Sequence, residues 1–125
     1  MKCVEFILYV ADQNSSTEFY KHVLQVEPSL HVDGMTEFTL SKNCKLGLMP
    51  EKGIAQIITP VTPNPETGNG IPRCELYIKV ETPESYMERA LEEGAVLVSE
   101  IQPRNWGDKV GYVMDADGHI LAFAQ

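Results

Sequence analysis

Short runs of alternating hydrophobic and polar residues recur along the chain, each with the length of a β-strand. The first run, residues 3–10, places Phe6, Leu8 and Val10 on one face of a strand. Runs of the same kind predict further strands at residues 29–33, 35–41, 44–49, 73–80 and 95–101, and a hairpin over 109–124.

Two other segments repeat their hydrophobic residues at helical spacing. Asp12 is a candidate N-cap for the first helix, with Ser15 and Ser16 as alternatives, and that helix runs to about Leu24. Its predicted core residues are Phe19, Tyr20, Val23 and Leu24. The second helix begins at Thr82-Pro83, because proline is favoured at the first helical position, and ends before Gly94. Its predicted buried stripe is Met87, Ala90 and Leu91.

The two halves of the chain share an order of elements and a short stretch of sequence. A shift of 70 positions places Glu5 on Glu75 and Val10 on Val80, and aligns Asp12 with Thr82 at the helix starts. Such an internal repeat indicates a duplicated structural unit. We therefore predict two modules, residues 1–49 and 73–125, within a single domain of residues 1–125. Residues 50–72, rich in proline and glycine, are a connector or a lid, with Ala55 to Ile58 able to hold a strand or a short helix.

The terminal hairpin turns at Asp115-Ala116-Asp117-Gly118. A two-residue loop would pair Asp115 with Gly118 and would place Gly111 opposite Ala122. In that register one face of the hairpin is core, with Val110, Tyr112, Leu121 and Phe123. The other face carries Lys109, Gly111, Val113, Ile120, Ala122 and Ala124, and we expect it to be hollow.

A strand, a D-x-D-G turn and a final strand, preceded by R-x-W-G, resemble the vicinal oxygen chelate superfamily of glyoxalases, bleomycin-resistance proteins and extradiol dioxygenases. The resemblance implies an α+β fold in which two tandem βαβββ modules form a curved mixed sheet around a cavity. It also implies assembly as a homodimer.

In metal-using members of that superfamily each module supplies ligands from its first and last strands. The matching positions here are Glu5, Gly47, Glu75 and Ala122, of which two have no donor atom. His22, His31 and His119 match none of them. Catalytic metals generally need three or more protein ligands, so we expect no metal and no other cofactor. A weak site for a hard cation on Glu5 and Glu75 remains an alternative.

The residues expected to bind a ligand are those of the predicted cavity face and its rim: Glu5, Tyr9, Glu75, Tyr77, Trp106, Gly111 and Ala122. No nucleophile, metal or oxyanion donor completes a mechanism, so no catalytic residue is assigned. Trp106, in the loop PRNWGD, is equally well read as a core residue or as a ligand contact.

The net charge of -8 argues against a nucleic-acid partner, which would require a basic patch. The same charge would steer a cationic ligand toward the protein, or it simply maintains solubility. Three cysteines without C-x-x-C spacing indicate reduced, buried thiols, and no segment is typical of a signal peptide or a membrane span, so we expect a cytoplasmic protein without a membrane partner.

Three functions fit these observations. The first is binding of a small, flat, partly cationic organic molecule without metal chemistry, as in bleomycin-resistance proteins. The second is a metal-dependent lyase, isomerase or dioxygenase of the same fold, which positions 47 and 122 disfavour. The third is a regulatory or structural dimer whose cavity binds nothing specific.

Overall fold

The computed structural model describes residues 1–125 and divides into two compact units, residues 1–21 with 25–69 and residues 70–125 with 22–24. The elements up to residue 69 are β1 (Val4–Val10), α1 (Gln13–Leu24), β2 (Leu30–Val32), β3 (Met35–Ser41), β4 (Cys44–Pro50), α2 (Glu51–Ile58) and the 3-10 helix η1 (Pro65–Thr67). Those after it are β5 (Glu75–Lys79), α3 (Pro83–Glu92), β6 (Val96–Pro103), β7 (Lys109–Met114) and β8 (Ile120–Ala124).

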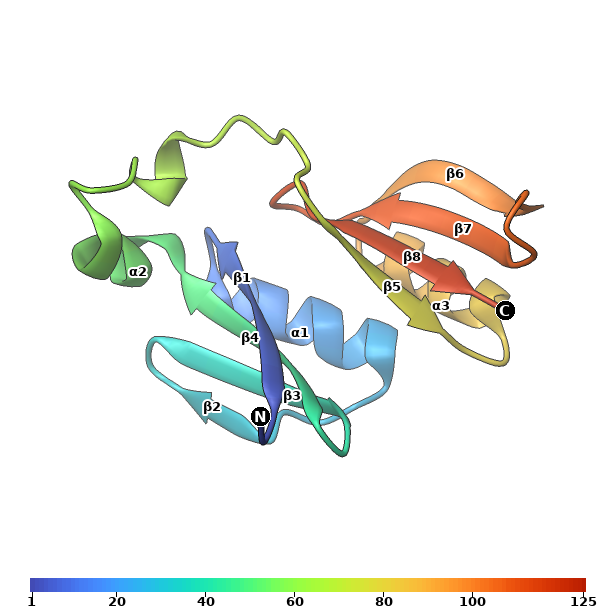
Figure 1. Cartoon of the computed structure of the whole chain (residues 1–125), viewed down its shortest axis with the longest axis horizontal. Coiled ribbons are helices and arrows are strands. Elements are labelled where there is room, and N and C mark those ends of the chain that lie inside the picture. The colour runs from blue at the N-terminus through green and yellow to red at the C-terminus, as the bar shows by residue number, and fades with distance from the viewer. The chain divides into compact units, whose positions relative to one another are not determined.

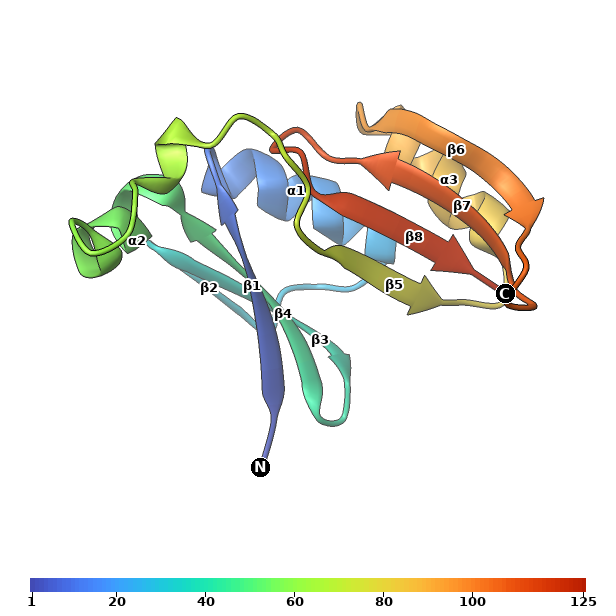
Figure 2. The ribbon, with the colours of Figure 1, turned by 45° about the horizontal axis from the view of Figure 1, so that its top comes forward.

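Each unit contains one mixed four-stranded sheet, in the order β1-β4-β3-β2 in the first unit and β5-β8-β7-β6 in the second (Figure 1). The first strand of each unit pairs in parallel with the last, and the remaining pairs are antiparallel. Figure 2 shows the same order of strands from a second direction. The expected α+β fold of two tandem βαβββ modules is therefore confirmed.

The start of α1 follows from its capping residue. The Asp12 side chain accepts a hydrogen bond from the Ser15 backbone N–H at 2.8 Å, which satisfies one of the unpaired donors of the first turn. This bond also lowers the pKa of the Asp12 carboxyl. Asp12 is thus the N-cap, and the alternatives Ser15 and Ser16 lie inside the helix.

The helix α3 begins at Pro83, as predicted, and buries Met87 and Ala90. Leu91, however, is 41% exposed, so its assignment to the buried stripe was wrong. Gly94 follows the end of the helix with a φ of +91°, a left-handed conformation that glycine adopts without steric cost.

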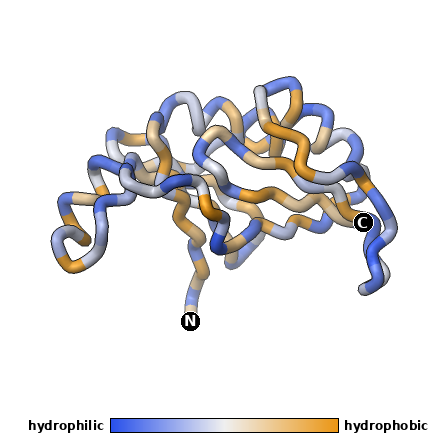
Figure 3. The backbone as a smooth tube through the Cα atoms, turned by 90° about the horizontal axis from the view of Figure 1, so that it is seen from above, coloured by the Kyte–Doolittle hydropathy of each residue, from blue (hydrophilic) through white to orange (hydrophobic).

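The hydrophobic core of each unit lies between its sheet and its helix. In the second unit, Val113, Leu121 and Phe123 are fully buried on this side of the sheet, which packs against α3. In the first unit the corresponding side chains are Phe38, Leu46 and Leu48. Figure 3 shows the hydrophobic colouring along the final strand before the C-terminus.

The terminal hairpin differs from its predicted register by one position. Tyr112 pairs with Ala122, and Gly111 pairs with Phe123. The cause is a three-residue loop: the Asp115 N–H donates to the His119 carbonyl, and Gly118 adopts a φ of +90°. Because a one-residue slip inverts every side chain of a strand, each residue of β7 lies on the opposite face from the one predicted. Leu121 and Phe123 lie in the core on the helix side as predicted, whereas Val110, which is also fully buried, and Tyr112 lie on the other face.

The segment between the modules holds more regular structure than predicted, because α2 begins at Glu51 and η1 spans Pro65–Thr67. The cysteines also differ from prediction, since Cys3 and Cys74 are exposed and Cys44 is only half-buried. None of the helices combines the length and the hydrophobicity needed to cross a membrane.

The duplication inferred from the sequence holds in the strand register. Ile7 of β1 pairs with Gly47 of β4, and the equivalent Tyr77 of β5 pairs with Ala122 of β8. Gly47 and Ala122 are therefore structurally equivalent positions in the two modules, as the alignment predicted.

Candidate functional site

Each sheet has a face turned away from its helix, and we call this its open face. In the second unit the open face carries side chains from β5, β7 and β8: Glu75, Tyr77, Lys79, Val110, Tyr112, Met114, Ile120, Ala122 and Ala124. Contrary to the prediction of a hollow face, its centre is filled, because the rings of Tyr77 and Tyr112 pack over Val110, Ala122 and Ala124. The two alanines leave room for these rings, so the open face presents aromatic surface instead of an empty space.

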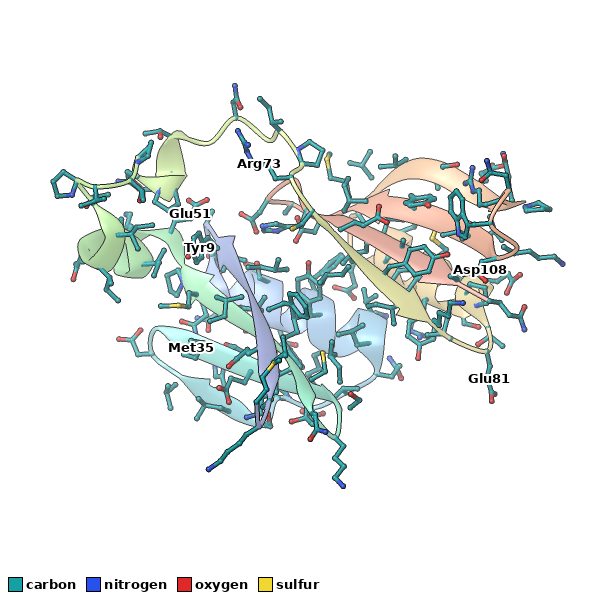
Figure 4. All side chains as sticks on the ribbon, viewed as in Figure 1. Tyr9, Met35, Glu51, Arg73, Glu81 and Asp108 are labelled. Atoms are coloured by element: carbon teal, nitrogen blue, oxygen red, sulfur yellow. The ribbon has the colours of Figure 1, made fainter.

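A chain of hydrogen bonds fixes an exposed tryptophan beside this face. The indole Nε1 of Trp106 donates to the Tyr77 hydroxyl at 2.9 Å, and that hydroxyl donates to Asp108 Oδ2 at 2.8 Å. Trp106 is 57% exposed, so it is not the core residue that one reading of the sequence allowed. Figure 4 labels Asp108, which lies beside the aromatic side chains of this unit. We call Tyr77, Trp106 and Tyr112 the aromatic platform.

Asp108 also pairs with a lysine of the same face. Lys79 Nζ lies 3.1 Å from Oδ1 and 3.0 Å from Oδ2, and the hydrogen bonds from Lys79 and Tyr77 lower the pKa of the Asp108 carboxyl. Burial is the main cause of the raised pKa of the Tyr77 hydroxyl. At neutral pH Asp108 is therefore a carboxylate that accepts from a neutral Tyr77, which keeps the bond to Trp106 in place.

Arg104 packs against Tyr112 of the aromatic platform. Its guanidinium carbon lies 5.2 Å from the centre of the Tyr112 ring, a cation–π distance. Its Nη2 donates to Ser99 Oγ at 2.8 Å and to the Val110 carbonyl at 3.0 Å, so the side chain is held across two strands. Its Nε is buried and has no hydrogen-bond partner.

The open face of the first unit is built around a glycine. A Cβ at Gly47 would lie 2.7 Å from Glu5 Oε1 and 3.0 Å from the Ile7 side chain, so the Glu5 carboxyl occupies the space that a side chain at 47 would need. Oε1 is buried there without a hydrogen-bond partner. Tyr9, labelled in Figure 4, follows on the same strand and is 37% exposed.

Two charged neighbours act on Glu5. Burial is the main cause of the raised pKa of the Glu5 carboxyl, and the negative charge of Glu37 raises it further. Lys45 opposes this effect, although its ammonium is already paired with Glu37 at 3.0 Å. The first unit therefore presents a half-buried carboxyl group close to a second one, an arrangement that favours a proton or a hydrogen-bond donor.

The metal centre of the superfamily does not fit these residues. Gly47 and Ala122 offer no donor atom at the two positions on the last strands. Glu5 also fills the space from which a side chain at 47 would coordinate. Each unit thus retains only one of its two ligand positions, fewer than a catalytic metal requires.

Another cluster of possible metal ligands lies in the terminal turn, where donor atoms of Asp115, Asp117 and His119 fall within 4.8 Å of one another. Asp115 Oδ1 accepts from the backbone N–H groups of Asp117 and His119, and Oδ2 lies 2.8 Å from His119 Nδ1. These bonds hold the turn, as the sequence indicated for Asp115 and Asp117. His31 likewise has a partner within the chain, Thr36 Oγ1 at 2.8 Å.

The predicted ligand-binding residues divide into three groups. Tyr77 and Trp106 are joined by a hydrogen bond, with Ala122 beneath the Tyr77 ring and Glu75 on the same face. Glu5 and Tyr9 share the open face of the first unit, four residues apart on β1. Gly111 was placed wrongly, because a Cβ there would point at Met87 and Ile101 on the helix side. The binding roles of the other residues stay predictions.

Sequence reasoning missed Tyr112, Arg104 and Asp108 as members of the site. Tyr112 was lost through the register error. Arg104 and Asp108 flank Trp106 in the same loop, and that proximity was the available signal. The partner of Asp108, Tyr77, lies 31 residues away, so the contact could not be read from spacing.

Comparisons with known proteins agree with the fold. A family model described as a glyoxalase-like domain matches residues 1–125. A glyoxalase-related enzyme from Fulvimarina pelagi superposes with a TM-score of 0.81 at 20% identity, covering 97% of this chain and 85% of that one. A glyoxalase/bleomycin resistance protein/dioxygenase family enzyme from Burkholderia phytofirmans gives a TM-score of 0.80 at 12% identity, covering 96% and 94%. No curated protein matched the sequence significantly.

Proposed function

Because the chain belongs to the glyoxalase-like domain family, within the vicinal oxygen chelate superfamily, we propose that it binds a small planar organic molecule without metal chemistry. The ligand is partly cationic and binds on the open face of the second unit. There the aromatic platform supplies stacking and Glu75 supplies negative charge, while Glu5 adds a negative charge on the open face of the first unit.

The observation that carries this proposal is the fixed, exposed indole of Trp106. An exposed aromatic side chain normally loses conformational freedom when a ligand stacks on it, and that loss weakens binding. The bonds from Trp106 to Tyr77 and from Tyr77 to Asp108 restrict the indole before the ligand arrives. Stacking or cation–π contact with such a ring contributes roughly 0.5–2 kcal/mol.

Two unpaired buried atoms support the same proposal. Buried polar atoms almost always have a hydrogen-bond partner, so each exception needs an explanation. The two such atoms are Glu5 Oε1, on the open face of the first unit, and Arg104 Nε, in the guanidinium that lies over the Tyr112 ring in the second unit. A ligand donor group at Glu5 Oε1, or a ligand acceptor group at Arg104 Nε, would supply the missing partner in each unit after small side-chain movements.

A metal-dependent enzyme of the same family is the rival function. Positions 47 and 122 count against it, since neither can coordinate through a side chain. The two structural relatives described above share 20% and 12% identity with this chain, so they support the fold and leave the reaction open.

Assembly as a homodimer is part of the proposal. It is supported by β1, an edge strand on which Val4, Phe6, Ile7 and Tyr9 are all more than a third exposed. Exposed hydrophobic edge strands favour pairing with another chain. Light scattering after size exclusion should give twice the chain mass of 14.0 kDa, and a monomer at micromolar concentration would contradict this part.

The test of ligand binding uses Trp106 as the reporter, because it is the only tryptophan. Its fluorescence is followed during titration with a cationic aromatic dye and with an anionic dye of similar size. We expect tighter binding of the cation, and weaker cation binding in Glu5→Gln and Glu75→Gln. Glu18→Gln, an equal change of charge on the exposed side of α1, serves as the control.

Equal or tighter binding of the anion would contradict the charge preference. An equal loss in Glu18→Gln would show that only net charge matters. Absence of any change in Trp106 fluorescence or in thermal stability with either dye would favour a dimer whose open faces bind nothing.

A further inference from the structure

A groove of about 500 Å³ lies on the helix side of the second unit, between α3 and β6. It is therefore on the opposite side of this sheet from the aromatic platform. Four of its lining residues are hydrophobic: Met87, Leu91, Leu97 and Ile101. The other four are acidic: Glu84, Glu88, Glu92 and Glu100. No basic residue lines it, so the groove combines an apolar floor with a negatively charged rim.

The acidic residues follow the length of the groove. Glu84, Glu88 and Glu92 are spaced four residues apart on α3, which places them along one side of the helix over about 12 Å. Glu100 belongs to β6, on the other wall. An occupant with positive charges along both of its edges would meet a carboxylate on each side.

The hydrophobic part of the groove is open to solvent on both of its walls. Leu91 on α3 is 41% exposed, and Leu97 on the edge strand β6 is 43% exposed. Exposed hydrophobic surface with a polar rim is typical of a protein interaction site. Met87 in the floor adds an adaptable side chain, a common property of surfaces that bind hydrophobic helices.

We propose that this groove binds an amphipathic helix of a partner protein. The hydrophobic face of that helix covers Leu91 and Leu97, and lysine or arginine residues at its edges pair with the glutamates. A helix that binds in a groove needs hydrophobic anchors over about two turns, or about 11 Å. The three glutamates on α3 extend along the groove over about 12 Å, so the groove is long enough for such a helix.

Two other occupants fit less well. A second copy of this chain would bring its own four glutamates against these four, and like charges across an interface cost several kcal/mol. A β-strand added to the edge of the sheet would need a regular partner strand. The register of β6 with β7 shifts between Leu97 and Ser99 and again before Gln102, and such bulges oppose pairing at an edge.

The test uses the full-length protein and a labelled synthetic peptide of about five helical turns, with leucine on one face and lysine at its flanks. Fluorescence anisotropy should show saturable binding that weakens as salt increases. The variant Glu84→Gln/Glu88→Gln should bind roughly fivefold more weakly, since each exposed ion pair contributes little alone. Glu92 is left unchanged because it lies 3.4 Å from His22 Nε2.

The control removes the same charge outside the groove. Glu81 lies between β5 and α3, as Figure 4 shows, and Glu81→Gln should change the affinity less than twofold, which is within the range of an exposed charge without a partner. Leu91→Gln tests the hydrophobic contact at a position exposed enough to tolerate the change. Glu75→Gln, on the open face, should leave peptide binding unchanged, so this proposal and the proposed function can fail separately.

The proposal is overturned if the peptide does not bind, or if a matched peptide with glutamate in place of lysine binds equally well. It is also overturned if a loss in Glu81→Gln equals the loss per charge in the double variant. Dimers of the free protein that Leu91→Gln dissociates would instead assign the groove to a second copy of this chain.

Discussion

The hydroxyl group of Tyr77 holds the aromatic platform together through two hydrogen bonds, and Tyr77→Phe removes only this hydroxyl. The phenyl ring keeps its packing against Val110, Ala122 and Ala124. The change breaks the bond from Trp106 Nε1 at 2.9 Å and the bond to Asp108 Oδ2 at 2.8 Å. Asp108 keeps its pairing with Lys79, so no buried charge is left without a partner.

The expected loss of stability is modest. A typical hydrogen bond contributes about 0.5–1.5 kcal/mol net, and the indole N–H of the largely exposed Trp106 can bond to water instead. The two bonds together therefore contribute about 1–2 kcal/mol to the free energy of unfolding. For a chain of this size that corresponds to a fall in Tm of roughly 3–10 °C.

The larger effect concerns Trp106. Without its acceptor the indole gains freedom that a ligand must remove again, at about 0.5–1.5 kcal/mol for one side chain. Affinity for an aromatic ligand should therefore fall roughly twofold to twelvefold. The free protein should also show lower fluorescence anisotropy and a red-shifted emission, because the indole becomes more mobile and more hydrated.

The matched control is Tyr112→Phe. Tyr112 belongs to the same platform, but its contacts are the Arg104 guanidinium and the residues beneath its ring, and no hydrogen bond holds its hydroxyl. If Tyr112→Phe changes Tm, emission and affinity as much as Tyr77→Phe does, the hydrogen bonds do not position Trp106 and the reasoning is refuted.

Three further predictions concern the first unit and the metal positions. The raised pKa of Glu5 means that its contribution to stability falls as pH rises through the folded pKa, so Glu5→Gln should stabilise the protein more at pH 7 than at pH 4. Urea unfolding at both values measures this, and an equal effect would contradict it. Gly47→Ala places a Cβ 2.7 Å from Glu5 Oε1, at the end of a side chain that can turn aside, and should lower the free energy of unfolding by about 1 kcal/mol, less so in a Glu5→Ala background. Equal losses in the two backgrounds would rule out that contact as the cause. Elemental analysis should find no stoichiometric Zn, Ni, Fe or Mn, and one equivalent per chain would refute our reading of Gly47 and Ala122.

The repeat was the most informative signal in the sequence. It predicted two βαβββ modules and made Gly47 equivalent to Ala122, and the strand register confirms both. Asp12 and Thr82-Pro83 located the helix starts correctly, because capping and the geometry of proline are local properties.

The hairpin register could not be predicted because both faces of β7 and β8 are hydrophobic. Alternation fixes a register only when one face is polar, and here Val113 on one face is matched by Tyr112 on the other. The turn D-A-D-G is compatible with loops of two or three residues. The aromatic platform was missed for a related reason, since Tyr77 and Trp106 meet only through tertiary structure.

The contact between Glu5 and Gly47 has a consequence for protein design. A metal-binding side chain installed at position 47 would place its first carbon 2.7 Å from Glu5 Oε1, so the Glu5 carboxyl, the end of a flexible side chain, would have to turn aside. Glu5 is itself one of the two ligand positions of the first unit. Any engineered conversion of this scaffold into a metalloenzyme therefore has to choose the residue at position 47 together with the orientation of Glu5, and a library that varies positions 5 and 47 jointly should yield more metal-binding variants than one that varies position 47 alone.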